Sequence, residues 1–204
     1  MTRLNLTNYD KHILSDCESY IRFEIGVPDF WEVKEKYMES VYIRSALIFE
    51  EIFKPNDDIT LIIEAPRLIE YIDEKTAPYI YNKIKKYIKN DELRNAFELV
   101  KGPDSYLRDD EMTVYRCILK CKTKDIKYRD LLKALGNQDM CLKPSFSDYV
   151  IFVHNEKEIA YNLYDDRGLD LNSWNRESLR GIYTKFNKWI LDYNRKEIDN
   201  MFKK

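Results

Sequence analysis

The residues that could do chemistry are most concentrated in one stretch, Tyr161–Leu171, which reads YNLYDDRGLDL. It holds two adjacent carboxylates, Asp165 and Asp166, followed by Arg167 and then Asp170. Carboxylate oxygens are ligands that Mg²⁺ prefers, and an arginine can hold a phosphate or carboxylate group. The stretch therefore raises the hypothesis of a metal-dependent enzyme that acts on phosphate esters, with the three aspartates as metal ligands.

The same residues also suit a turn that holds no metal. Asp165 follows an expected strand, and an aspartate at the first position of a turn with Gly168 at the fourth is a favoured composition. Arg167 can neutralise one carboxylate, and a glycine offers a permissive backbone. Because neighbouring side chains of an extended segment point in opposite directions, Asp165 and Asp166 can face one metal only if the chain bends. The chemistry favours a turn with an internal ion pair, leading into a short strand at Leu169–Leu171.

A second pair of charges lies in the N-terminal segment Ser19–Gly26, SYIRFEIG. Its alternation predicts a strand in which Arg22 and Glu24 share one face, opposite the apolar side chains of the same segment. In an ordinary strand these two residues would form a same-face ion pair. If the strand lay beside the YDDRG turn, they would instead join its acids in one polar cleft suited to metal-assisted phosphate chemistry.

The segment Pro78–Asn90, PYIYNKIKKYIKN, is basic and carries interleaved tyrosines. On a helix, Lys83, Lys86 and Lys89 could share one face, and tyrosine rings can stack on nucleic-acid bases. The whole chain nonetheless has 34 Lys and Arg against 36 Asp and Glu, a net charge of −2. Because no positive field covers the molecule, nucleic acid is disfavoured as a partner, and the segment is interpreted as an ordinary solvated helix face.

Cysteine, histidine and glycine supply no cofactor motif. Cys117 and Cys121 are expected on one face of a strand, as core thiols, and no CxxC occurs. The two histidines, His12 and His154, have no second plausible ligand near them in sequence, which disfavours a zinc site. The chain has five glycines and neither a GxGxxG nor a GxxxxGK[ST] loop. We therefore expect no glycine cradle for a nucleotide, and no cofactor.

The apolar segments are too short for a signal peptide or a membrane helix, and this bears on the cellular compartment of the protein. The N-terminus has no apolar run of signal-peptide size. The longest apolar runs, such as Ile59–Ala65, are of strand length, far below the roughly 20 residues of a membrane helix. The four cysteines fit reduced thiols. We expect a cytoplasmic protein that does not contact the membrane.

The secondary structure expected around these residues alternates between strands and helices. Strands are expected at Ser19–Gly26, Ile59–Ala65 and Met112–Cys121, a hairpin at Asp148–Asp165, and helices at Val33–Ile52, Pro66–Val100, Asp125–Leu135 and Asn175–Tyr193. Asp29 with Glu32 resembles a helix capping pair, and Gly136 a left-handed helix cap. The mixture predicts an α+β fold, as a single domain over residues 1–204, in which amphipathic helices cover a mixed or antiparallel sheet with a C-terminal hairpin.

Several segments carry a resemblance to a known family. They are YIRFEIG, IFEEIFKPNDDI, DIKYRDLLKALGNQD, the tail IYTKFNKWILDYNRKEID, and above all YDDRG-x-D. The chain resembles a family of small bacterial proteins, mostly from Gram-positive species, described only as a domain of unknown function, with YDDRG-x-D near the C-terminus as its signature. The resemblance covers most of the chain and implies a shared whole-domain arrangement. It carries over no activity, cofactor or catalytic residue.

The composition favours binding over catalysis. Sixteen tyrosines stand against three tryptophans, and 34% of the residues are charged with both signs present. Tyrosine is enriched at protein interfaces, and charged interfaces give fast and specific capture. We interpret the sequence as a protein-binding module of immunity or antitoxin type that neutralises a partner protein such as a toxin domain. The alternative is the metal-dependent enzyme centred on the YDDRG-x-D segment.

Overall fold

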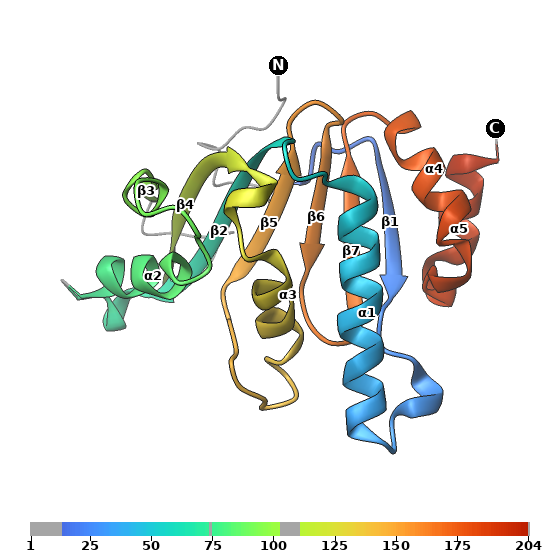
Figure 1. Cartoon of the computed structure of the whole chain (residues 1–204), viewed down its shortest axis with the longest axis horizontal. Coiled ribbons are helices and arrows are strands. Elements are labelled where there is room, and N and C mark those ends of the chain that lie inside the picture. Colours follow the sequence, from blue (N-terminus) through green and yellow to red (C-terminus); the bar gives the residue numbers. More distant parts are fainter. Residues whose placement is uncertain (1–13, 74, 103–110, 204) are drawn as a thin grey trace.

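The computed structural model describes residues 14–73, 75–102 and 111–203 (Figure 1). Its seven strands form one sheet in the order β1-β7-β6-β5-β2-β4-β3, and every neighbouring pair is antiparallel. This confirms the predicted α+β class and selects the antiparallel sheet over the mixed one. The single domain over residues 1–204 stays a prediction, although every described strand joins this sheet.

The elements follow the chain in an order that interleaves helices with strands. The strands are β1 (Ser19–Glu24), β2 (Asp58–Leu68), β3 (Glu98–Lys101), β4 (Met112–Lys122), β5 (Tyr149–His154), β6 (Ile159–Leu163) and β7 (Gly168–Ser173). The α-helices are α1 (Lys34–Ile52), α2 (Thr76–Lys85), α3 (Tyr128–Gly136), α4 (Glu177–Lys185) and α5 (Asp192–Phe202). Short 3-10 turns are η1 (Pro28–Phe30), η2 (Ile69–Tyr71), η3 (Leu93–Asn95), η4 (Thr123–Asp125) and η5 (Asn187–Trp189).

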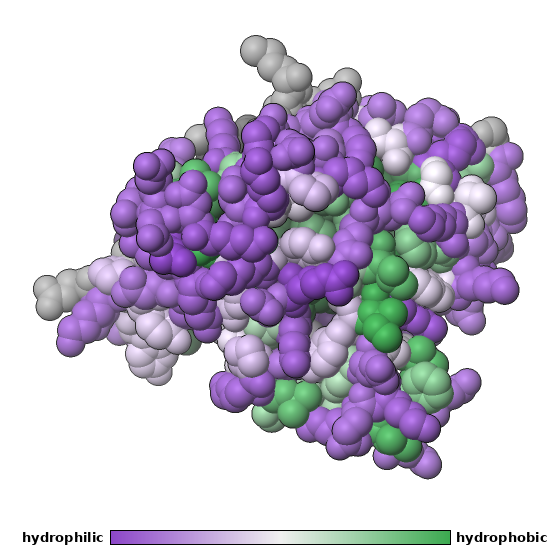
Figure 2. Space-filling model, viewed as in Figure 1, coloured by the Kyte–Doolittle hydropathy of each residue, from purple (hydrophilic) through white to green (hydrophobic). Residues whose placement is uncertain are grey.

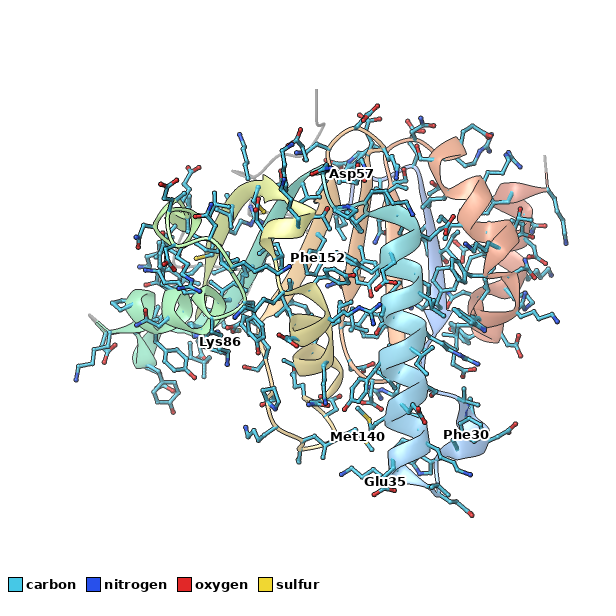
Figure 3. The ribbon with its side chains drawn as sticks, in the orientation of Figure 1. Phe30, Glu35, Asp57, Lys86, Met140 and Phe152 are labelled. Atoms are coloured by element: carbon cyan, nitrogen blue, oxygen red, sulfur yellow. The ribbon has the colours of Figure 1, made fainter. Side chains whose placement is uncertain are left out.

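The main core lies between one face of the sheet and helices α1 and α3, while α4 and α5 lie beside the edge strand β1 (Figure 1). Phe49 of α1 is at its centre, with its ring 5.0 Å from that of Phe152 and 5.3 Å from that of Tyr161. Figure 3 shows Phe152 in the layer between the strands and α1. A smaller apolar cluster, which includes Ile62 and Trp174, covers part of the opposite face. Each strand therefore has an inner and an outer face that the alternation of its sequence defines.

That alternation places the predicted strand residues as expected. In β1, Ile21 and Phe23 are fully buried in the main core while Arg22 lies on the other face. In β4, Cys117 and Cys121 belong to the core side, as predicted, and burial raises the pKa of each thiol to about 12. None of the described helices has the length and apolar content that crossing a membrane requires.

The helical prediction for Pro66–Val100 is largely wrong. Strand β2 continues to Leu68, because it pairs with β4 along its whole length. Pairing of β2 with β5 stops at Glu64, so Pro66 lies where β2 has a single neighbouring strand, a place where proline is tolerated. Within the remainder, the one α-helix is α2, and the chain then returns to the sheet as β3.

The long helix predicted at Asn175–Tyr193 is divided into α4, η5 and α5. Between η5 and α5 the chain extends and forms a bridge between Ile190 and Phe23 of β1. The Leu191 N–H donates to the Arg22 carbonyl over 2.9 Å. The helix is interrupted because this segment supplies hydrogen bonds to the edge of β1, which covers part of an edge that would otherwise be open.

Two predicted helix caps are also wrong. No side chain caps the start of α1, and Asp29 instead lies in η1. Gly136 is the last residue of α3 and is not left-handed, since no described glycine has a positive φ. A Cβ at Gly136 would lie 2.9 Å from a Val41 methyl. Glycine is needed there because α3 approaches α1 closely.

Candidate functional site

The YDDRG segment forms the turn between β6 and β7, and Asp165 holds it together. One carboxylate oxygen of Asp165 accepts the backbone N–H groups of Arg167 and Gly168, at 2.8 and 3.0 Å. The other oxygen accepts Nε of Arg167 at 2.9 Å and also its Nη2. The Arg167 carbonyl accepts the Ile25 N–H at the end of β1, at 3.0 Å. The predicted turn with an internal ion pair is confirmed.

Asp166 points away from Asp165 and into the protein. It is 2% exposed, and its Oδ2 accepts the hydroxyl of Tyr37 from α1 over 2.8 Å. Burial raises the pKa of Asp166 above its ordinary value, because it disfavours the charged form, and the Tyr37 hydrogen bond opposes that rise. Burial and the neighbouring carboxylate likewise raise the pKa of Tyr37. The hydrogen-bond partner of this buried acid is therefore a neutral donor.

Asp170 has a third environment, on the outer face of the sheet. It lies opposite Arg22 across the β1–β7 pair and binds it through two hydrogen bonds, Nε to Oδ1 and Nη2 to Oδ2, each of 2.7 Å. The same-face pair predicted between Arg22 and Glu24 is wrong. Asp170, directly opposite Arg22 on the neighbouring strand, is closer to it than Glu24, which is two positions along the same strand. Arg22 therefore pairs with Asp170. The guanidinium carbon of Arg22 also lies 5.9 Å from the centre of the Tyr164 ring.

Five of the six candidate residues thus separate into three places, and the sixth, Glu24, lines a hollow beside Trp31. Asp165 with Arg167 holds the turn, Asp166 is bound to Tyr37, and Asp170 is paired with Arg22. Within the described parts of the chain, no group of three or more His, Cys, Asp or Glu side chains is placed to hold a metal ion. The predicted magnesium ligands Asp165, Asp166 and Asp170 are not brought together. They also share no single cleft with Arg22 and Glu24.

Two hollows lie next to one another around Tyr164. One, of about 500 Å³, includes Arg22 and Asp170 in its lining. The other, of about 640 Å³, is lined by Glu24, Gly26, Pro28, Trp31, Tyr37, Tyr164, Arg167 and Leu191. We call the second hollow the Trp31 groove. Five separate segments build it: the end of β1, η1 with the residue after it, α1, the β6–β7 turn and the residue before α5.

Aromatic rings form the walls of the Trp31 groove. The Trp31 ring is 5.0 Å from that of Tyr37 and nearly perpendicular to it, at 85°. Trp31 is 59% exposed, whereas Tyr37 is buried and fixed by its hydrogen bond to Asp166. The YDDRG turn therefore helps to form the groove. Asp166 fixes the orientation of Tyr37, and Arg167 is itself a lining residue.

Two glycines allow these rings to lie against the backbone. A Cβ at Gly26 would lie 2.3 Å from the Tyr37 ring, and one at Gly168 would lie 1.8 Å from the Tyr164 oxygen. The expectation that Gly168 serves the turn through a permissive backbone is wrong, because no described glycine has a positive φ. Its role is to leave room for the Tyr164 ring.

Sequence reasoning missed Trp31, Tyr37 and Tyr164 as groove residues. The spacing of Tyr37 in the apolar stripe of α1 correctly predicted that the residue is buried. The spacing could not show that its hydroxyl binds Asp166. A usable signal exists in the glycines, since Gly26 and Gly168 stand at the ends of adjacent strands where no left-handed turn is required. Such glycines indicate a close approach by a side chain.

The other predicted sites do not assemble. Helix α2 ends at Lys85, so Lys86 and Lys89 lie beyond it, and Lys83 is paired with Asp148 at 3.0 Å. The expected common helix face of Lys83, Lys86 and Lys89 is therefore absent, and Figure 3 shows Lys86 at the end of this helix. His154 is buried and bonded to Asp57 at 3.0 Å, while His12 lies outside the described residues.

Comparison with known proteins places the chain among relatives without an assigned activity. A family model described as "Domain of unknown function (DUF3885)" matches residues 6–194. The chain is also similar to a protein of Bacillus subtilis (strain 168) with the name "Uncharacterized protein YnaE". The two are 30% identical over 173 residues, which cover 79% of this chain and 78% of that protein. No solved structure matches the chain.

Proposed function

The chain belongs to the DUF3885 family, a domain of unknown function. From the geometry we propose that this protein is a protein-binding module of immunity or antitoxin type. It neutralises a partner protein by covering part of that protein's surface. Membership of an uncharacterised family agrees with the resemblance seen in the sequence, while the YDDRG-x-D signature and the Gram-positive range stay predictions.

The observation that carries the proposal is the concentration of exposed apolar side chains along η1 and α1. Five of the ten large hydrophobic side chains exposed in the described residues come from this segment: Phe30, Trp31, Val33, Ile43 and Leu47. We call these five residues the α1 face. Figure 2 shows apolar side chains exposed over this region, and Figure 3 shows Phe30 projecting outward from η1. Exposed apolar patches of this kind mark interaction sites on soluble proteins.

The residue types next to the α1 face support the same function. Trp, Tyr and Arg are enriched among the residues that dominate binding energy at protein interfaces. The Trp31 groove adjoins the face through Trp31 itself and combines that ring with Tyr37, Tyr164 and Arg167. A pocket lined by such residues, beside an apolar surface with charges at its rim, has the composition of an interface centre.

The enzyme alternative has weaker support. Each of its three proposed metal ligands already has a separate structural role, since Asp165 fixes the turn, Asp166 orients Tyr37, and Asp170 binds Arg22. The step from binding module to immunity or antitoxin protein rests on the abundant charges of both signs, which favour rapid capture of a target.

The test is co-expression with the products of the genes that flank this one. We expect one of these products to inhibit growth when expressed alone, and this protein to form a complex with it and restore growth. Leu47→Glu, on the exposed side of α1, should abolish the protection. Tyr71→Glu is the matched control, because Tyr71 is 72% exposed on η2, away from α1, and should leave protection intact.

Two outcomes would overturn the proposal. One is the absence of any complex with the products of the flanking genes. The other is a complex that Leu47→Glu and Tyr71→Glu affect equally, since docking would then not use the α1 face. Circular dichroism of both variants checks that each retains its fold.

A further inference from the structure

We propose that the Trp31 groove binds the guanidinium group of an arginine side chain presented by the partner protein. The inference rests on the proposed function and deepens it, because it names the chemistry that anchors the partner. Three features support this inference: the aromatic rings that line the groove, the negative charge around it, and the planar shape of a guanidinium group, which suits an aromatic ring beside a carboxylate.

The aromatic walls favour a cation. Trp31 and Tyr37 stand nearly perpendicular, at 85°, and Tyr164 lines the same hollow. Aromatic faces carry negative potential, and Trp is the best of the three aromatic residues at attracting a cation. Cations, arginine guanidinium groups among them, bind over the faces of such rings, and hollows lined by several rings recognise cationic ligands.

The charges around the groove are negative in sum. Glu24 stands at the rim, Asp166 lies behind Tyr37, and Asp165 and Asp139 flank Arg167. Against these four carboxylates stand three cations: Arg167, Arg44, which donates to the Glu24 carbonyl, and Lys34, which donates to the Met140 carbonyl next to Asp139. Four carboxylates against three cations leave one negative charge when all are ionised. A cation entering the groove therefore meets a favourable field.

Glu24 supplies a specific acceptor. Its backbone carbonyl accepts Nη1 of Arg44, and the same guanidinium group attracts the Glu24 carboxylate from a distance. No donor among the described residues is hydrogen-bonded or ion-paired to that carboxylate, so its oxygens can accept from a ligand in the groove. Arg167 does not occupy that role, because Asp165 and Asp139 already bind its guanidinium group. An incoming cation can thus stack on Trp31 and donate hydrogen bonds to Glu24.

The planar form of arginine suits this site better than the ammonium of lysine. A guanidinium group stacks flat on an indole ring and offers a fork of donors to one carboxylate, while its weak hydration makes it easier to remove from water. A volume of about 640 Å³ accommodates the head group and its aliphatic stem. The stem would lie along Pro28 and Leu191, the apolar lining of the groove.

The experiment titrates the whole protein with N-acetyl-arginine amide and follows the indole N–H signals of the three tryptophans by NMR. Trp31→Phe identifies the Trp31 signal. We expect a saturable shift of that signal with a dissociation constant in the millimolar range, and affinity about ten-fold lower for Glu24→Gln. N-acetyl-citrulline amide, which has the same shape without the charge, should give no saturable shift.

A matched control separates a local contact from bulk charge. Glu92→Gln removes the same charge from an exposed position outside the groove and should keep the wild-type affinity. N-acetyl-lysine amide should bind about three-fold more weakly than the arginine probe. Equal binding of the citrulline probe, equal binding of the lysine probe, or no shift with arginine would each overturn the inference.

The outcomes also distinguish this inference from the proposed function. If a flanking-gene product forms a complex that requires Leu47 but the arginine probe does not bind, the function stands and the inference falls. If the arginine probe binds as expected but no complex forms with any flanking-gene product, the groove has the proposed chemistry and the proposed function falls.

Discussion

Two neighbouring regions around Tyr164 use charge in opposite ways. On the outer face of β1 and β7, Arg22 and Asp170 satisfy each other through two hydrogen bonds of 2.7 Å. In the Trp31 groove, Asp166 has a neutral hydroxyl as its partner, and the Glu24 carboxylate forms no ion pair with any described residue. The first region has its charges matched internally, whereas the second keeps a surplus. Capacity to bind another molecule is expected where the protein leaves such a surplus beside apolar rings.

The largest expected effect is on partner binding. Trp31→Ala should weaken the complex by about 2 kcal/mol or more, because it removes a central aromatic residue of the groove. Asp170→Asn, in the matched region, should change the affinity by less than about 0.5 kcal/mol. Isothermal titration calorimetry with the purified partner checks both. Equal losses for the two variants would remove the distinction between the regions.

Gly168→Ala should destabilise the fold by about 1–3 kcal/mol, since the new methyl group would overlap the Tyr164 ring. Gly181→Ala provides the control, because nothing lies within 4 Å of a Cβ at this position inside α4. That change should stabilise the protein by about 0.5–1 kcal/mol through helix propensity. Urea unfolding measures both, and a destabilising Gly181→Ala or a neutral Gly168→Ala would contradict the packing explanation.

Tyr37→Phe should cost about 1–3 kcal/mol of unfolding free energy, because it leaves the buried Asp166 carboxylate without its donor. Asp166→Asn keeps an acceptor for the Tyr37 hydroxyl and removes a buried charge, so its stability should equal or exceed that of the wild type. Chemical denaturation of the two variants gives the comparison. A larger loss for Asp166→Asn than for Tyr37→Phe would show that the charge itself is needed.

The same pair predicts a pH dependence. The folded pKa of Asp166 lies above the ordinary value of about 3.9, so the folded state keeps this proton to higher pH than the unfolded state does. Its contribution to stability is complete below the unfolded pKa and is lost as the pH rises through the folded pKa. The stability of Asp166→Asn relative to the wild type should therefore increase over this window. A constant difference from pH 3 to 7 would contradict the raised pKa.

The smallest effect is expected from the matched pair on the outer face. Arg22→Gln should cost less than about 1 kcal/mol, because the arginine side chain is 37% exposed and water screens the ion pair. Thermal unfolding at low and high salt provides the measurement, and the difference should shrink as salt is added. A loss as large as that of Gly168→Ala would mean that this pair is a main support of the sheet edge.

Much of the fold could be predicted because it is encoded locally. Alternating apolar residues identified β1 and the β5–β6 hairpin, and a three-to-four spacing identified α1. The errors came where distant segments decide the structure. Strand β2 runs on past Pro66 because β4 pairs with it, and the last helix breaks because Ile190 reaches Phe23. No local pattern records either contact.

Of the candidate site, only the YDDRG turn could be predicted from the sequence. Asp165 and Arg167 are close neighbours in sequence, so their ion pair could be inferred from composition. The Trp31 groove could not, because Glu24, Trp31, Tyr164 and Leu191 come from segments that only the folded sheet brings together. Asp166 illustrates the limit most clearly: one residue from Asp165, it faces a helix more than a hundred residues earlier in the chain.

Hydrogen–deuterium exchange of the complex with the toxic flanking-gene product shows which surface of this protein docks. If docking uses the α1 face and the Trp31 groove, the peptides that cover Pro28 to Leu47 and the β6–β7 turn should exchange more slowly in the complex, while η2 and α2 should be unchanged. Protection confined to η2 and α2, with none at η1 and α1, would mean that the partner docks elsewhere and that the α1 face is not the binding surface.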